Sequence, residues 1–126
     1  MTIIDCYCGS LDRYSQCCEK YIEGVKKAPT AEKLMRSRYA AYARQEAGYL
    51  VATTHPSERK YHSKEDILKW ARSNDWQKLE VIKSTDNTVE FKAYFFDAFG
   101  TNQTHHELST FKFENGSWFY VDGTFY

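Results

Sequence analysis

The four cysteines of this 126-residue chain all lie near its start, within the thirteen residues CYCGSLDRYSQCC. A closed tetrahedral zinc site takes four soft ligands, and the motifs Cys6-x-Cys8 and Cys17-Cys18 supply two sulfurs each. Gly9 follows the first pair, at the point where the chain must turn back so that the sulfurs can converge. The spacing therefore predicts one structural zinc ion, held by Cys6, Cys8, Cys17 and Cys18.

Other interpretations of these cysteines stay open at the level of sequence. Adjacent cysteines can bond to each other only in a strained ring, so an oxidised chain would pair each cysteine of the first motif with one of the second. Redox-active or unliganded thiols are the further alternatives. The start MTIIDC lacks the basic and apolar regions of a signal peptide. We therefore expect a cytoplasmic protein, in which reduced thiols favour zinc over disulfides.

The composition indicates one folded core and gives no sign of a polyanionic partner. Tyr, Phe and Trp make up 17% of the residues, which is enough large apolar surface for a core in a chain of this length. Lys and Arg total 17, as do Asp and Glu, so the formal net charge is zero. Nucleic acid and anionic membranes are therefore not expected as partners. No segment approaches the roughly 20 apolar residues of a membrane span.

Helical periodicity follows the cysteines. Helices are expected over 16–23, from 31 onward, over 49–53 and over 64–73. Ser15, Thr30 and Ser63 immediately precede three of these segments and are suitable N-cap residues. In the long helix Leu34, Met35 and Tyr39 fall within one apolar stripe, whereas Arg36 lies on the opposite side and is expected in solvent.

From Trp76 onward the hydrophobic period changes to two, which is typical of strands. Alternating residues run through 79–81, 89–95 and 104–114, and a further strand follows Asn115-Gly116, a strong hairpin-turn signal. A two-residue turn there places Phe113 opposite Trp118, Phe111 opposite Tyr120, and Ser109 opposite Asp122. Helices followed by strands predict the α+β class, with helices on one face of an antiparallel sheet of about four strands.

The cysteine segment resembles the SEC-C motif, a zinc-binding module whose usual form is C-P-C-G-S-G-x-x-Y-x-x-C-[CH]. The chain keeps the metal ligands and three further positions of the motif, namely Gly9, Ser10 and Tyr14. It departs at Tyr7, where Pro is usual, and at Leu11, where Gly is usual. Neither departure removes a ligand, although Leu11 is expected to reshape the loop and any partner surface on it.

The chain as a whole is similar to the YchJ-like bacterial family, in which a SEC-C motif precedes a domain of the nuclear transport factor two-like fold. The similarity runs through APTAEKLMRSRYAAY, the stretch from Tyr49-Leu50 to His55-Pro56, and the ending SWFYVDGT. It implies a zinc-binding module over 1–27 and an α+β domain over 28–126, in which a curved sheet wraps around a helix as a cystatin-like cone. The family has no settled activity, so the resemblance implies fold and metal but no reaction.

The cone of this fold leaves a pocket that some of its members use for catalysis and others for binding or packing. Arg38 lies between Leu34 and Tyr42 on the apolar helix side, at about 100° of rotation per residue. Asp97 continues the inward phase of the preceding strand. The pocket candidates are therefore Arg38, Asp97, Tyr42 and His55, with His105, Glu107 and Asp122 as possible acid–base partners. The alternative is a purely structural ion pair, or an arginine that reaches solvent.

Three functions remain in contention. The first is a cytoplasmic zinc protein acting as an adaptor, because the translocase ATPase module that the motif resembles binds a protein partner. The second is a small-molecule binder or enzyme that uses the cone, and the third is a protein in which zinc serves stability alone. A zinc ion with four protein ligands has no open position, which argues against catalytic zinc in all three cases.

The last hairpin carries apolar residues on both of its faces, namely Phe111, Phe113, Trp118 and Tyr120 on one and Leu108, Phe119 and Val121 on the other. A sheet with helices on one side usually shows water a polar second face. A homodimer or partner contact through the sheet is therefore predicted, with coverage by the zinc module or a loop as the alternative.

Overall fold

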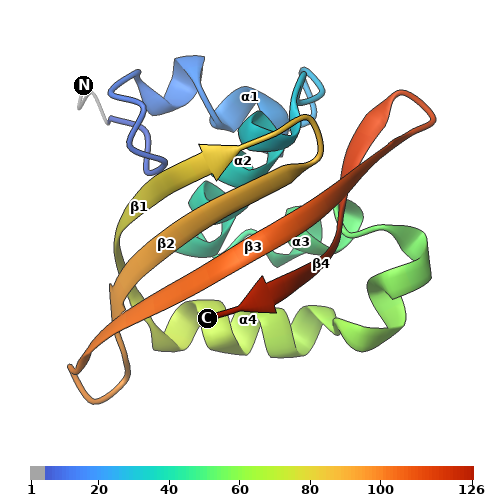
Figure 1. The fold of residues 1–126 in the computed structure, drawn as a ribbon. Helices are drawn as coiled ribbons and strands as arrows, with labels where there is room; N and C mark the ends of the chain where they lie inside the picture. Colours follow the sequence, from blue (N-terminus) through green and yellow to red (C-terminus); the bar gives the residue numbers. More distant parts are fainter. Residues whose placement is uncertain (1–4) are drawn as a thin grey trace.

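A curved four-stranded antiparallel sheet forms one layer of the protein, and the helices lie against its inner face (Figure 1). The computed structural model describes residues 5–126. The strands are β1 (Asp75–Ser84), β2 (Thr88–Phe96), β3 (Asn102–Glu114) and β4 (Ser117–Phe125), and they pair in the order β1-β2-β3-β4. The predicted α+β class is confirmed.

The helices begin largely where the sequence predicts. They are η1 (Tyr14–Gln16), α1 (Glu19–Ile22), α2 (Ala31–Ala43), α3 (Ala47–Ala52), η2 (Pro56–Tyr61) and α4 (Lys64–Ser73). Thr30 caps α2 by accepting a hydrogen bond from Lys33 N, and Ser63 caps α4 by accepting one from Asp66 N. The prediction of one helix over 16–23 capped by Ser15 is wrong. Two residues, Cys17 and Cys18, separate η1 from α1, and their sulfurs lie with those of the other cysteines.

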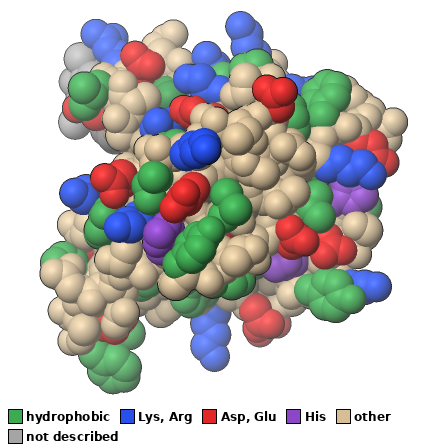
Figure 2. Space-filling model, viewed as in Figure 1, with side chains coloured by type: hydrophobic (Ala, Val, Ile, Leu, Met, Phe, Trp, Pro, Cys, Tyr) green, Lys and Arg blue, Asp and Glu red, His purple; other side chains and the backbone are tan. Residues whose placement is uncertain are grey.

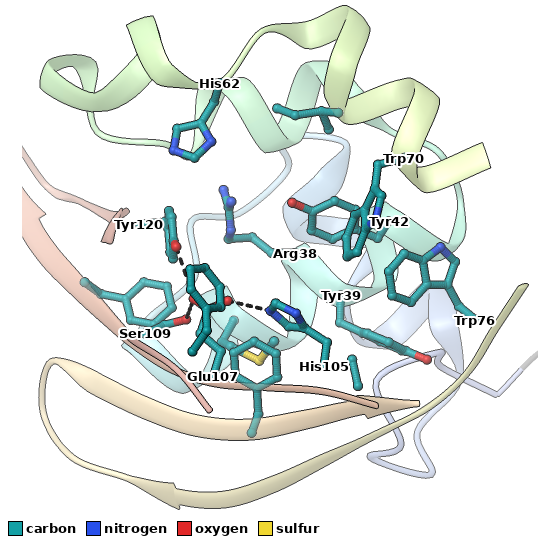
Figure 3. A pocket seen from close by; sticks show the side chains of 16 residues that line it. Arg38, Tyr39, Tyr42, His62, Trp70, Trp76, His105, Glu107, Ser109 and Tyr120 are labelled. Atoms are coloured by element: carbon teal, nitrogen blue, oxygen red, sulfur yellow. Dashed lines mark hydrogen bonds and ion pairs between the residues drawn. The ribbon is translucent and has the colours of Figure 1, made fainter. Parts of the chain in front are cut away.

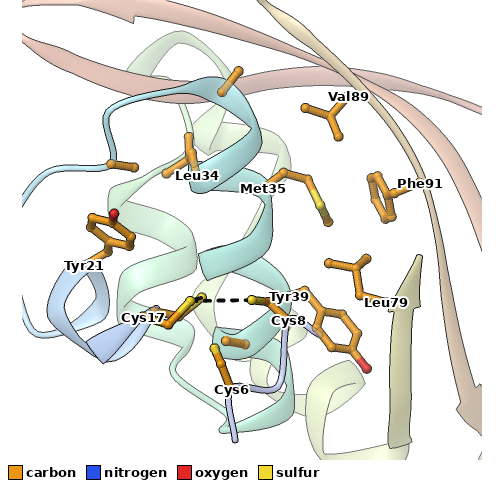
Figure 4. Packing of buried hydrophobic residues seen from close by; sticks show 14 of the residues in the cluster. Cys6, Cys8, Cys17, Tyr21, Leu34, Met35, Tyr39, Leu79, Val89 and Phe91 are labelled. Atoms are coloured by element: carbon orange, nitrogen blue, oxygen red, sulfur yellow. Dashed lines mark hydrogen bonds between the residues drawn. The ribbon is translucent and has the colours of Figure 1, made fainter. Parts of the chain in front are cut away.

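Helix α2 packs on the sheet and forms the main core (Figure 4). Its residues Leu34, Met35 and Tyr39 contact the inward side chains of β1 and β2, among them Val89 and Phe91. The alternating burial of β2 follows from the two-residue period of a strand. The buried cysteines belong to the same cluster, so the cysteine segment and the α+β part share one core. The division of the chain near residue 27 stays a prediction.

The β3–β4 hairpin matches the predicted turn but not the whole predicted register. Asn115 and Gly116 have φ angles of 52° and 79°, as the two-residue turn with left-handed residues requires. The pairs Phe113–Trp118 and Phe111–Tyr120 are confirmed. Beyond them a bulge between Thr110 and Phe111 shifts the register by one residue. Ser109 therefore pairs with Gly123, whereas Asp122 lies opposite Thr110 and is exposed.

The outer face of the sheet is mixed in character. Leu108, Phe119 and Val121 are half-buried, and the ring of His55 contacts that of Phe119 at a centroid distance of 5.7 Å. In Figure 2 hydrophobic side chains on this face lie among charged residues and histidine. Contact of this face with a second copy of the chain stays a prediction. Within residues 5–126, no helix combines the length and the apolar composition needed to cross a bilayer.

Candidate metal centre and cavity

The four cysteine side chains converge on one point. Their Sγ atoms all lie within 4.8 Å of one another, with 3.7 Å between Cys8 and Cys17 and 3.9 Å between Cys17 and Cys18. A tetrahedral zinc ion with Zn–S bonds of about 2.3 Å spaces its sulfurs about 3.8 Å apart. All four residues are at most 5% exposed, and none forms a disulfide. The cluster therefore has the ligand set and the dimensions of a closed metal site.

The thiols alone cannot all be ionised in this cluster. Hydrogen bonds from Cys18 and Cys6 lower the pKa of Cys8 far below its usual value, whereas hydrogen bonds with Cys6 and Cys8, together with burial, raise the pKa of Cys18. The cluster thus stabilises one thiolate at the expense of its neighbours. A divalent cation removes this conflict, because it coordinates each sulfur as a thiolate.

Helix α2 and strand β1 hold the cysteine loop in place. Arg36 Nη1 donates to the carbonyl oxygen of Cys8 at 2.8 Å, and Arg36 Nε donates to Glu32 at 3.0 Å. The other oxygen of Glu32 accepts from Ser84 Oγ at 2.9 Å. The expectation that Arg36 is simply solvated is wrong, because the cysteine loop lies against this side of α2 and the Cys8 carbonyl accepts from Arg36.

The loop between the cysteine pairs contains backbone that favours glycine. Gly9 has a φ of 82° and Leu11 a φ of 69°, and a side chain in this left-handed region costs roughly 1–2 kcal/mol. This backbone conformation explains why glycine is usual in the motif at the place that Leu11 occupies in this chain. The Leu11 side chain is 85% exposed, so packing does not offset the cost. Tyr7, at the position where Pro is usual, accepts from Arg44 Nη1 at 3.3 Å and packs on Tyr14.

Replacing Leu11 by glycine should stabilise the protein. Leu11→Gly relieves the left-handed strain, partly offset by the larger entropy of glycine in the unfolded chain. We expect the free energy of unfolding, measured by urea denaturation of metal-loaded protein, to rise by about 0.5–1 kcal/mol. Leu11→Ala is the matched control, because it keeps a Cβ at the same φ and should show no gain. Equal stability of the two variants would contradict the assignment of strain to Leu11.

A cavity of about 190 Å³ lies between α2, the η2–α4 segment and the inner face of the sheet. Aromatic and aliphatic side chains form most of its wall. Its polar lining residues are Arg38, Tyr42, His62, His105, Glu107, Ser109 and Tyr120 (Figure 3). The cavity therefore combines an apolar interior with a few polar groups, as small-molecule sites do.

Glu107 is a buried, ionised carboxylate on the sheet side of the cavity. It is 6% exposed. One oxygen accepts from His105 Nε2 at 2.7 Å, and the other accepts from Ser109 Oγ and from Tyr120 OH (Figure 3). Burial by itself would raise the pKa of Glu107, but these hydrogen bonds outweigh it and hold the pKa below its usual value. A buried carboxylate with three donors is charged at neutral pH.

Arg38 supplies the opposite charge from α2. It is 7% exposed, its Nη1 donates to Leu50 O at 2.9 Å and to Thr53 Oγ1 at 2.7 Å, and its guanidinium lies 4.7 Å from the centroid of the Tyr120 ring. Among residues 5–126, no carboxylate lies within ion-pairing distance of it. Tyr42, one turn further along α2, also lines the cavity. A binding role for these two candidates stays a prediction.

The other two pocket candidates lie elsewhere. Asp97 follows the end of β2, and its carboxylate accepts from Phe99 N and Thr101 N in the β2–β3 turn and from Gln103 Nε2 at the start of β3. The expected Arg38–Asp97 pair is thus not formed, because the inward phase of β2 ends with the strand. His55 is bonded through Nε2 to Glu114, on the edge of the sheet, and does not line the cavity.

Gly123 is a position beside Glu107 that the sequence does not point to. A Cβ on this residue would lie 2.6 Å from Cδ and 2.8 Å from Cγ of Glu107, closer than side-chain packing allows. The bulge in the β3–β4 pairing brings Gly123 opposite Ser109, next to the carboxylate. The sequence VDGT shows that a glycine stands here, but it does not show that Glu107 lies beside it. That contact depends on the bulge, which the sequence does not reveal.

Gly123→Ala should destabilise the protein through Glu107 specifically. We expect a loss of about 2 kcal/mol or more in the free energy of unfolding, because the carboxylate must leave its three buried donors. In a Glu107→Ala background the same substitution should cost less than about 0.5 kcal/mol, since the added methyl group then meets no carboxylate. Urea denaturation of the four proteins measures this coupling.

Gly48→Ala in α3 is the control, because a Cβ there meets nothing closer than Lys64 Nζ at 3.9 Å and alanine favours a helix. It should be neutral or stabilising. Additive effects of Gly123→Ala and Glu107→Ala would contradict the contact.

Comparison with protein families identifies most of the chain. Residues 30–123 match the model described as the YchJ, middle NTF2-like domain. A UPF0225 protein of Geobacter sulfurreducens is 40% identical over 125 residues, which cover 94% of this chain and 77% of the relative. The UPF0225 protein YchJ of Shigella dysenteriae is also 40% identical over 125 residues, covering 94% of this chain and 82% of that protein.

Two solved structures have the same fold. One is the solution structure of a SEC-C motif containing protein from Rhodopseudomonas palustris, with a TM-score of 0.88 and 36% identity, covering 96% of this chain and 98% of the other. The second is the crystal structure of a SEC-C motif containing protein from Psychrobacter arcticus, with a TM-score of 0.79 and 34% identity, covering 100% of this chain and 84% of the other.

Proposed function

The chain belongs to the YchJ family of UPF0225 proteins, and from this membership and the geometry of the cysteine cluster we propose that it is a cytoplasmic protein with one structural zinc ion. The observation that carries the proposal is the convergence of four buried sulfurs at distances that suit zinc. Thiolates select soft or borderline metals such as zinc over magnesium and calcium. With all four positions taken by protein, the ion stabilises the fold and has no place for a substrate.

The purified protein should contain about one equivalent of zinc. Cys8→Ser should lose most of that zinc and about 3 kcal/mol or more of stability, which corresponds to a fall in Tm on the order of 10 °C. Elemental analysis and thermal unfolding measure the two effects, and cobalt substitution with its sulfur-to-metal absorption identifies the ligands. Ser15→Ala, an exposed position between the cysteine pairs that keeps every sulfur, serves as the control. Less than half an equivalent of zinc, together with an unchanged Tm in Cys8→Ser, would sink the proposal.

The cysteine module also presents a surface for a protein partner. Leu11 is the supporting feature, because it combines a strained backbone with an apolar side chain that is 85% exposed. Both properties cost stability or solubility and neither improves packing within the chain. Burial of the Leu11 side chain against another protein would offset these costs. The adaptor function therefore centres on the turn between the two cysteine pairs.

The Leu11→Gly variant separates partner binding from stability. The variant should be at least as stable as the wild type. A partner is first captured from lysate with the wild type, and its binding is then measured with purified proteins. We expect Leu11→Gly to bind this partner with roughly a tenth of the wild-type affinity or less, since a buried leucine contributes about 1.5–3 kcal/mol. Phe99→Ala is the control, because Phe99 is 93% exposed and lies in the distant β2–β3 turn. The adaptor function fails if Leu11→Gly and the wild type bind the same partners equally.

A second candidate function is the binding of a small molecule in the cavity. The observation that favours it is the guanidinium of Arg38, which is buried in an apolar wall without a carboxylate partner among the described residues. A buried charge of this kind is costly unless a further group compensates it. The zinc and cavity functions are compatible, since the two sites share no residue.

A further inference from the structure

We propose that the cavity binds a small, flat organic carboxylate, with the carboxylate on Arg38 and the apolar body between the aromatic walls. The inference rests on the cavity function proposed above and adds the chemical class of the ligand. Three observations support it. Two nitrogens of the Arg38 guanidinium make no described hydrogen bond to the protein, both oxygens of Glu107 already accept hydrogen bonds, and the cavity has the size and the aromatic walls that suit one ring.

Arg38 has hydrogen-bond donors to spare on the cavity side. Its described bonds to the protein, to Leu50 O, Thr53 Oγ1 and Thr54 Oγ1, all use Nη1. Within residues 5–126, no fully buried side-chain nitrogen or oxygen lacks a partner, so Nε and Nη2 are not sealed in the core. Arg38 lines the cavity beside the Tyr42 hydroxyl, whose pKa is raised by burial and lowered in part by the Arg38 charge. Two parallel N–H groups match the two oxygens of a carboxylate, and such a charge-assisted pair is among the strongest hydrogen-bonded contacts.

Glu107 does not serve as the anion for Arg38. Both of its oxygens accept hydrogen bonds from the sheet, from His105 on one side and from Ser109 and Tyr120 on the other. Gly123 leaves the space for this arrangement. The carboxylate is therefore held against the sheet, and the charge on Arg38 is left for a group that enters the cavity.

The charges of the wall favour a monoanion over a phosphate. Arg38 is the only lysine or arginine among the described lining residues, and Glu107 is a fixed negative charge in the same cavity. A second negative charge on the ligand would meet Glu107 with no second lysine or arginine to offset it, and His105 is already hydrogen-bonded to Glu107. A carboxylate with one charge fits this balance better than a phosphate with nearly two.

The remaining wall indicates a flat apolar body. Tyr42, Trp70, Trp76 and Phe91 line the cavity, and Trp70 and Trp76 pack edge to face with ring centroids 5.1 Å apart. An apolar cavity of about 150 Å³ is large enough for benzene, so about 190 Å³ accommodates one ring with a short acidic substituent. Benzoate and cinnamate are therefore suitable probes.

The test compares ligands that differ in charge but hardly in shape. Wild-type protein is titrated with benzoate, cinnamate, the isosteric amides benzamide and cinnamamide, and phenyl phosphate. Calorimetry gives the affinity, and the fluorescence of Trp70 and Trp76 reports occupancy of the cavity. We expect each carboxylate to bind at least tenfold more tightly than its amide and more tightly than phenyl phosphate. Arg38→Met should remove the preference for the acid while amide binding remains.

The outcomes separate this inference from the cavity function beneath it. Equal binding of acids and amides, or tighter binding of phenyl phosphate, overturns the carboxylate class but leaves the cavity as a binding site. Absence of binding by all five probes at millimolar concentration overturns both. If Arg38→Met does not fold, Arg38→Lys replaces it, since a single ammonium should weaken the acid preference severalfold. The wild-type series remains decisive without any variant.

Discussion

The packing of helix α2 against the inner face of the sheet is the interaction on which the rest of the structure depends. Because a helix turns about 100° per residue, nearby positions on α2 face different parts of the protein. Met35 packs in the core, Arg36 holds the carbonyl of Cys8, and Arg38 lines the cavity. The position of one helix thus sets the core, the metal centre and the cavity together.

The metal centre and the cavity differ in how they treat charge. In the cysteine cluster the thiols compete for ionisation, and the proposed metal ion would balance their charge inside a closed shell. In the cavity, Glu107 and Arg38 are each held by their own partners, and neither neutralises the other directly. The first arrangement favours stability, whereas the second leaves a cation facing open space, where a ligand can compensate it.

Sequence reasoning succeeded where the determining interactions are local. The caps at Thr30 and Ser63 involve backbone groups three residues away, and Asn115-Gly116 sets its own turn. The predictions are wrong where the position of a residue depends on a strand distant in the sequence. The phase of β2, extended past the end of the strand, wrongly predicts Asp97 in the cavity. A two-residue turn without a bulge wrongly pairs Ser109 with Asp122, because the bulge beside Phe111 has no local signature.

The sequence by itself determined the α+β class, the family resemblance and the four cysteines of the candidate metal site, because these depend on spacing and periodicity within short segments. Only the tertiary structure decided that the sulfurs meet in the shared core, that Glu107 rather than Asp97 is the buried acid, and that Gly123 leaves room for it. The physical reason is that each of these facts is a contact between elements far apart in the chain. Such contacts follow from strand register and helix placement, which no single segment encodes.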